Sequence, residues 1–115
     1  MYRREGKPEI VLLTGYTDFR YEINSLTALL PSKGLDSFAD AVYVFCQKGR
    51  SSVKLLYWGG SGFWLIQYRL EKGKVAWLKE NGTAGITYWQ MEWLLDGLDI
   101  EQKHYVGAVK GRLLT

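Results

Sequence analysis

Residues 53–70 read Val-Lys-Leu-Leu-Tyr-Trp-Gly-Gly-Ser-Gly-Phe-Trp-Leu-Ile-Gln-Tyr-Arg-Leu. Two runs rich in aliphatic and aromatic residues flank a Gly-Gly-Ser-Gly segment. Branched and aromatic side chains suit a pleated strand, and clustered glycines supply the positive φ angles that a tight reversal needs. The stretch therefore predicts a β-hairpin with aromatic residues at its tip.

The neighbouring sequence extends this hairpin into a meander with predicted strands at 41–47, 52–58, 63–70 and 75–78. Pairing Trp58 with Phe63 places Lys54 opposite Gln67, and a turn at 48–51 places Cys46 opposite Val53. A turn at Lys72-Gly73 would likewise pair the third strand with the fourth. One face is then apolar, with Val42, Val44, Cys46, Val53, Leu55, Tyr57, Trp64, Ile66, Tyr68, Leu70, Val75 and Trp77. The other face is mixed, with Tyr43, Phe45, Leu56, Trp58, Phe63 and Leu65 beside Lys54, Gln67, Arg69 and Lys74.

The remaining segments supply a strand and two helices. Residues 9–14 predict a buried strand, and a helix is expected from a cap at Thr17 or Asp18 to its stop at Pro31. Residues 79–85 are expected to form a loop. Thr87 with Gln90 predicts a capping box for a second helix, which ends near 97. The predicted fold is α+β: an antiparallel β-meander of four strands plus an N-terminal strand, packed on one face by two helices.

Composition limits the class of protein. A length of 115 residues and an apolar content of 47% indicate one soluble globular domain, 1–115, with flexible tails at 1–8 and 100–115. No apolar run is long enough for a membrane helix, and no signal peptide is evident. A single cysteine, Cys46, and a single histidine, His104, form neither an internal disulfide nor a usual zinc site. We expect a cytoplasmic protein.

Charge is distributed unevenly. The net charge is +3, yet residues 48–79 hold seven basic side chains and one acidic side chain, Glu71. A basic region of this kind indicates a surface that faces a polyanion, and equally suits a well-solvated hairpin.

Three blocks of sequence resemble a known family over residues 10–99. They are Gly15-Tyr-Thr-Asp-Phe-Arg20, the hairpin with the strand before it and the turn after it, and Ile86-Thr87 through Asp99. The chain is similar to the TnpB-like accessory proteins of bacterial insertion sequence 66 elements, which are unrelated to the RNA-guided nuclease of that name. The family motif corresponds here to Asp18, Arg20, Tyr57, Trp58, Gly62, Phe63 and Trp64. Tyr21 stands where the family usually has Lys, and the turn at 48–52 is less rich in Arg.

This resemblance implies a role in DNA transposition, beside a separate transposase and other element-encoded proteins in a bacterium. It implies no defined chemistry. We find no catalytic constellation, and we expect no enzyme activity, cofactor, metal or small-molecule ligand. Asp18 and Arg20 are interpreted as a salt bridge or cap. Asp36 with Asp40, or Asp96 with Asp99, are the carboxylates that a metal-dependent nuclease would use, and caps and turns explain them as well.

Two binding hypotheses remain open. In the first, transposon DNA binds the mixed sheet face, with phosphates on the basic side chains and bases stacked on exposed aromatic rings. The residues concerned are Arg50, Lys54, Arg69, Lys72 and Lys74, with Trp58 and Phe63 for stacking. Alternatively, these aromatic residues close a second small core. In the second hypothesis, Trp89 and Trp93 dock onto the transposase as an adaptor surface without DNA contact.

Overall fold

A computed structural model of the chain describes residues 7–98 and residue 100. The tails predicted to be flexible lie almost entirely outside the described residues, as do Asp99 and His104. Neither helix in the described part has the length and apolar character that a membrane span requires.

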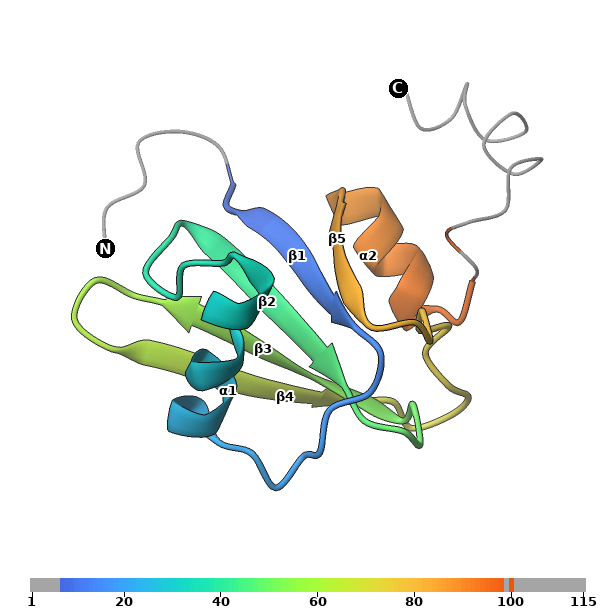
Figure 1. Ribbon diagram of the computed structural model, residues 1–115. Coiled ribbons are helices and arrows are strands. Elements are labelled where there is room, and N and C mark those ends of the chain that lie inside the picture. Colours follow the sequence, from blue (N-terminus) through green and yellow to red (C-terminus); the bar gives the residue numbers. More distant parts are fainter. Residues whose placement is uncertain (1–6, 99, 101–115) are drawn as a thin grey trace.

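The core of the fold is a five-stranded mixed sheet (Figure 1). Its strands are β1 (Glu9–Thr14), β2 (Ala41–Cys46), β3 (Ser52–Trp58), β4 (Phe63–Arg69) and β5 (Gly82–Ile86). They lie in the order β4-β3-β2-β1-β5. The pairs β2–β3, β3–β4 and β1–β5 are antiparallel, and β1 runs parallel to β2. The α+β class is confirmed, and the N-terminal strand lies inside the sheet.

The predicted register of the central hairpins is confirmed. Trp58 pairs with Phe63, and the pairing continues along both strands to Ser52 and Arg69. Cys46 likewise lies opposite Val53. Since the side chains of a strand alternate between its two faces, this register fixes which residues can enter which core.

The prediction for the last strand was wrong. Residues 75–78 form no strand, so they do not pair with β4. The loop expected at 79–85 instead contributes residues 82–85 to β5, which extends to Ile86. Val75 and Trp77 are buried, but the amide of Val75 donates to the carbonyl of Arg50 at 2.8 Å instead of to a neighbouring strand. The glycine-rich segment becomes a strand because β1 offers it an unpaired edge, and tertiary pairing overrides its weak intrinsic preference.

The prediction that both helices cover one face was also wrong. Helix α1 (Ile23–Leu29), with a 3₁₀ turn at Pro31–Lys33, packs Leu26 against Tyr43 and Phe45 on the mixed face. Helix α2 (Tyr88–Leu95) packs Leu94 with Val44 and Val53 on the other face. In Figure 1, α1 crosses the sheet over β2–β4, and α2 lies beside β5. The sheet therefore has a hydrophobic core on each side.

The capping box of α2 is confirmed. The amide of Gln90 donates to the Thr87 hydroxyl at 3.1 Å, and the amide of Thr87 donates to the Gln90 side chain at 2.9 Å. This reciprocal pair satisfies two of the orphan amides at a helix start.

Candidate functional site

Lys54 is buried beneath the segment that precedes α1. Its side chain is 5% exposed, and its ammonium donates to the carbonyls of Phe19 and Tyr21 at 2.9 Å each. A carboxylate oxygen of Glu22 accepts from it at 3.3 Å. The prediction that Lys54 belongs to an exposed basic face was therefore wrong, because α1 and its leading segment cover that face.

Lys54 also accounts for the late start of the first helix. The helix was expected from Thr17 or Asp18, but α1 begins at Ile23 and Glu22 is its cap residue, without a side-chain capping bond. Residues 15–22, hereafter the motif loop, stay extended or turned. The carbonyls of Phe19 and Tyr21 accept hydrogen bonds from the buried ammonium of Lys54. These backbone groups are therefore satisfied without the hydrogen bonds of a helix.

The motif loop is fastened to the sheet at its first residues. Gly15 has a φ of 79°, its amide donates to the Leu78 carbonyl at 2.9 Å, and its own carbonyl accepts from the Trp77 indole at 2.7 Å. The amide of Thr17 donates to the Cys46 carbonyl at 2.9 Å. The left-handed conformation explains a glycine at the start of this motif.

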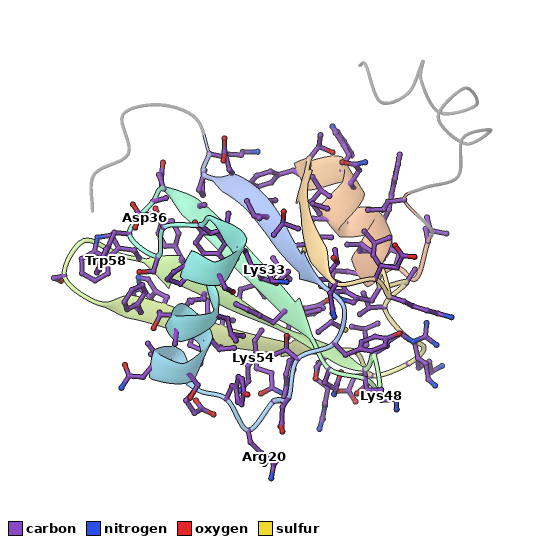
Figure 2. All side chains as sticks on the ribbon, in the orientation of Figure 1. Arg20, Lys33, Asp36, Lys48, Lys54 and Trp58 are labelled. Carbon is purple, nitrogen blue, oxygen red and sulfur yellow. The ribbon has the colours of Figure 1, made fainter. Side chains whose placement is uncertain are left out.

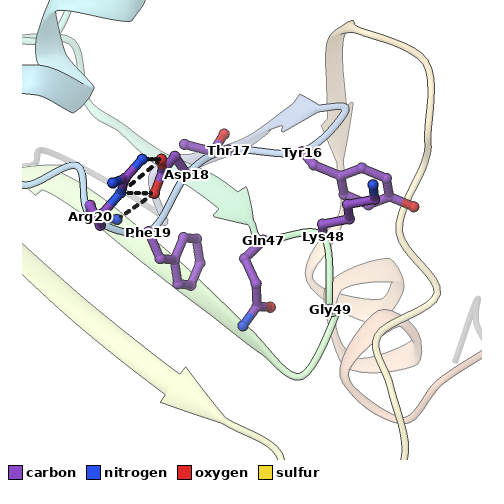
Figure 3. A pocket seen from close by; sticks show the side chains of 8 residues that line it. All are labelled: Tyr16, Thr17, Asp18, Phe19, Arg20, Gln47, Lys48 and Gly49. Carbon is purple, nitrogen blue, oxygen red and sulfur yellow. Dashed lines mark hydrogen bonds and ion pairs between the residues drawn. The ribbon is translucent and has the colours of Figure 1, made fainter.

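Asp18 and Arg20 form an exposed, two-pronged ion pair across the loop (Figure 3). The Arg20 guanidinium donates from Nη2 to Oδ2 at 2.6 Å and from Nε to both carboxylate oxygens, and its backbone amide donates to Oδ1 at 2.9 Å. These bonds lower the pKa of Asp18 to about 2. The expected salt bridge is present, and Asp18 stabilises a turn instead of capping α1.

The motif loop and the β2–β3 turn enclose an open depression of about 600 Å³ (Figure 3). Its lining consists of Tyr16, Thr17, Asp18, Phe19, Arg20, Gln47, Lys48 and Gly49. Gln47 holds the turn in place, because its side-chain oxygen accepts from the amides of Ser51 and Ser52 at 3.1 Å. Most of its lining surface is apolar, with the charged groups of Arg20 and Lys48 among its lining residues. No nucleophile lies beside a base among these residues, which suits binding more than catalysis.

Three segments meet at this end of the sheet: the motif loop, the β2–β3 turn at 47–51 and the loop at 70–81. The bonds from Thr17 to Cys46, from Gly15 to Leu78 and from Val75 to Arg50 connect them. We call this region the basic end. Its basic residues are Arg20, Lys48, Arg50, Lys72, Lys74 and Lys79, with Arg69 at the end of β4, and its acidic residues are Asp18, Glu22, Glu71 and Glu80. Arg20 and Lys48 are labelled in Figure 2.

The basic residues predicted to bind phosphate differ in exposure there. Lys72, Lys74 and Arg69 are exposed, and Arg69 contacts Glu71 at 3.2 Å. Arg50 is half-buried in a left-handed turn position, with a φ of 60° and a guanidinium bond to the Val75 carbonyl at 3.5 Å. Apart from the buried Lys54, four residues were predicted to bind phosphate. Three of them, Arg69, Lys72 and Lys74, are exposed to solvent, whereas the Arg50 guanidinium also bonds to the backbone.

The aromatic residues predicted to stack on bases lie at the opposite end of the β3–β4 hairpin. Trp58 and Phe63 are half-buried and form a cluster with Phe38, with ring centroids 4.9 to 5.8 Å apart. The six-residue step along β4 from Phe63 to Arg69 spans roughly 20 Å at the usual strand rise. The structure therefore separates the predicted stacking residues from the exposed cations.

The other predicted residues are dispersed. Trp89 is 52% exposed on α2, whereas Trp93 is half-buried. The Tyr57 hydroxyl donates to Asp40 at 2.9 Å, and no atom would meet a side chain added at Gly62.

Trp64, expected on the core face, is 63% exposed. Sequence patterning missed this exposure because it cannot indicate how far α2 extends across the sheet.

Within the described ranges, no cluster of three metal-ligating side chains occurs. The Asp36 carboxylate accepts from the amide of Phe38, and Asp40 accepts from Tyr57, so both have structural bonds. Cys46 is buried, and desolvation raises the pKa of its thiol to about 12. These groups therefore fit structural roles.

Comparison with known proteins identifies relatives. A family model described as "IS66 Orf2 like protein" matches residues 8–105. The chain is similar to two proteins of Sinorhizobium fredii (strain NBRC 101917 / NGR234), named uncharacterized protein y4jC and uncharacterized protein y4hO. It is 38% identical to y4jC over 66 residues, which is 56% of each chain. It is 30% identical to y4hO over 90 residues, covering 76% of this chain and 78% of y4hO. No solved structure matched the chain.

Proposed function

Because the chain belongs to the IS66 Orf2-like protein family, we propose that it is an accessory protein of insertion-sequence transposition that binds element DNA through its basic end. In this proposal it acts beside a separate transposase in the bacterial cytoplasm and catalyses no step itself. The family supports the accessory role, and the charge of the basic end supports DNA as the ligand.

One observation carries the DNA proposal. Three segments that are distant in sequence, together with Arg69 at the end of β4, bring seven basic side chains to one end of the sheet, with four acidic ones. Three of those carboxylates are in ion pairs, Asp18 with Arg20, Glu71 with Arg69 and Glu22 with the buried Lys54. Lys48, Lys72 and Lys74 remain exposed. Such a group of exposed lysines favours DNA binding, because each contact neutralises a phosphate and releases its counterion.

The expected mode of contact is backbone binding. Lys54 is buried and Trp58 and Phe63 lie far from the cations, so neither group takes part in this version of the proposal. Phosphate contacts fix position and orientation on a duplex but carry little sequence information. We therefore expect modest discrimination between a transposon end and a scrambled duplex.

The test measures binding to a fluorescent duplex of about 30 base pairs from the end of an insertion sequence 66 element. The double variant K72Q/K74Q removes two exposed charges without changing a described hydrogen bond. We expect its affinity to fall about tenfold or more near 50 mM salt. Its slope of log affinity against log salt should be shallower by about 2, one unit for each lost phosphate contact.

The matched control is K7Q/K33Q, which removes the same charge outside the basic end. Lys7 precedes β1, and Lys33 lies in the 3₁₀ turn that leads to β2. This control should retain most of the affinity. Undetectable binding by the wild-type chain at about 50 mM salt refutes the proposal, as does an equal loss in the two variants.

A second candidate function is an adaptor that binds the transposase through α2. The observation in its favour is the exposed indole of Trp89, with Tyr88 beside it at 41% exposure. Exposed aromatic anchors are typical of protein interfaces. Trp89→Ala should abolish co-purification with the transposase while leaving the thermal midpoint unchanged. Retained co-purification excludes this surface.

A further inference from the structure

Strand β4 carries an exposed apolar stripe. Trp64, Ile66 and Tyr68 alternate along one face of the strand and are 63%, 53% and 49% exposed. Their cross-strand neighbours on β3 are Tyr57, Leu55 and Val53. Helix α2 covers the inner part of this face, where Leu94 packs with Val44 and Val53, and leaves the outer strand uncovered. The stripe was predicted to be core, and it lies in solvent.

The outer edge of β4 is also open. Its inner neighbour is β3, and no described strand pairs with its other side (Figure 1). Natural edge strands are usually protected by lysine, proline or a bulge. Residues 63–68 of β4 contain no charge, proline or glycine. This edge therefore has the backbone groups and side chains that another strand needs for pairing.

The hydrogen-bond pattern shows which backbone groups face outward. The amide of Leu70 donates to Ser51 at 2.8 Å, and the amide of Gly59 donates to Gly62 at 2.7 Å. Because bonded and non-bonded pairs alternate along an antiparallel ladder, Trp64, Ile66 and Tyr68 direct their backbone groups toward β3. Phe63, Leu65, Gln67 and Arg69 then direct theirs toward the open edge.

We propose that this edge binds a second copy of the chain, with the two β4 strands antiparallel about Ile66 and the two sheets continuous. In this register Leu65 exchanges backbone bonds with the partner's Gln67, and Phe63 does so with the partner's Arg69. Ile66 faces the partner's Ile66. Trp64 faces the partner's Tyr68, and the same contact recurs by symmetry. A two-fold axis requires a self-complementary surface of this kind.

The charges of the strand favour its own copy as the partner. Arg69 is the charged residue of β4, and it lies opposite the partner's Phe63, where a cation–π contact is favourable. The two Arg69 side chains are six residues apart along the pair, roughly 20 Å, so they do not repel strongly. Aromatic and aliphatic cross-strand pairs stabilise every position of the stripe.

The available area sets the expected strength. The exposed parts of the three side chains offer roughly 300 Å² on each copy, and the strand edge adds a similar amount. A total near 1,200 Å² is at the lower limit of stable interfaces. We therefore expect a weak dimer with a dissociation constant in the micromolar range. Since each copy carries a net charge of +3, added salt should leave dimerisation unchanged or strengthen it.

The first experiment follows the mass of the full chain by sedimentation from about 1 to 200 μM, without DNA. Ile66→Lys places two like charges opposite each other and should make the protein monomeric throughout this range. The control Thr83→Lys adds the same charge at an exposed position of the other edge strand, β5, and should remain dimeric. A wild-type chain that is monomeric at 200 μM overturns the proposal. So does a Thr83→Lys variant that loses the dimer while Ile66→Lys keeps it.

The second experiment tests the register without depending on stability. A non-bonded pair places Cα atoms about 4.5 Å apart, within the range of a disulfide. Oxidised Ile66→Cys should form a cross-linked dimer, whereas Thr83→Cys should stay monomeric after denaturation. The native thiol, Cys46, is buried and does not compete. No cross-link at Ile66 overturns the register.

These results are independent of the proposed DNA contact. If the chain dimerises but does not bind the duplex, the proposed function fails and this inference stands. If Ile66→Lys loses DNA affinity while the wild-type chain sediments as a monomer, DNA occupies the stripe and this inference fails. Salt separates the two interactions, because it weakens phosphate contacts steeply.

Discussion

Replacing Lys54 with methionine tests whether this buried cation holds the motif loop on the sheet. Lys54→Met keeps most of the apolar stem and removes the ammonium that donates to Phe19, Tyr21 and Glu22. A hydrogen bond to a charged group contributes about 1.5–3 kcal/mol. Loss of the two carbonyl bonds is partly offset, because the loop can admit water. We expect the free energy of unfolding to fall by about 2–4 kcal/mol.

The Glu22 carboxylate contributes little to this effect. Its side chain is 74% exposed, and ion pairs with an exposed partner are worth at most about 1 kcal/mol. Glu22→Gln is therefore the matched control, with an expected cost below about 1 kcal/mol. Urea unfolding followed by tryptophan fluorescence measures both variants. A Lys54→Met protein whose free energy of unfolding lies within about 0.5 kcal/mol of wild type refutes this role of Lys54, and so does an equal loss in Glu22→Gln.

Three further predictions concern the same end of the sheet. Gly15→Ala should cost about 2 kcal/mol, since its φ of 79° strains an L-residue and the added carbon meets the side chain of Asn81; thermal melts would show this cost. The Asp18 carboxyl should titrate near pH 2 in a carbon-detected NMR series, and Arg20→Gln should return it toward 3.8. Because the folded pKa is the lower one, the stabilisation by this pair is present above about pH 4 and is lost as the pH falls through 2. Cys46 should resist a thiol reagent at pH 8 until the chain unfolds, since burial raises its pKa to about 12; fast labelling of the native protein would contradict this.

Local sequence signals predicted the hairpins well. The turn glycines fixed the loop between Trp58 and Phe63, and the alternation of side chains then determined the register as far as Ser52. The capping box at Thr87 located the start of α2. In each case the deciding interaction joins residues close together in sequence, where residue type alone carries the information.

The errors arose where distant segments compete for one partner. Residues 75–78 have a better intrinsic strand preference than residues 82–86, but the open edge of β1 is filled by the second segment. The helix expected from Asp18 was shortened because Lys54, 36 residues later in sequence, binds its leading carbonyls. Such outcomes depend on tertiary geometry that periodicity does not contain.

The same limit affected the site. Charge counting located the basic segment 48–79 but could not distinguish the buried ammonium of Lys54 from the exposed one of Lys72. Pairing put Phe63 and Arg69 on one face, although the strand between them keeps the two side chains apart. Whether Lys54 reaches solvent depends on where α1 and the segment before it lie, and the sequence pattern does not contain that position.

The place of β1 in the sheet has a consequence for synthesis. This first strand is flanked by β2 and β5, and β5 follows every other strand in the chain. A nascent chain that has emerged only through β4 can form the hairpins and the parallel β1–β2 pair, but it leaves one side of β1 unpaired. Until residues 82–86 leave the ribosome, Leu12 and its neighbours form an unpaired, aggregation-prone strand edge. Translational pausing before that point would favour misassembly or recruit a chaperone.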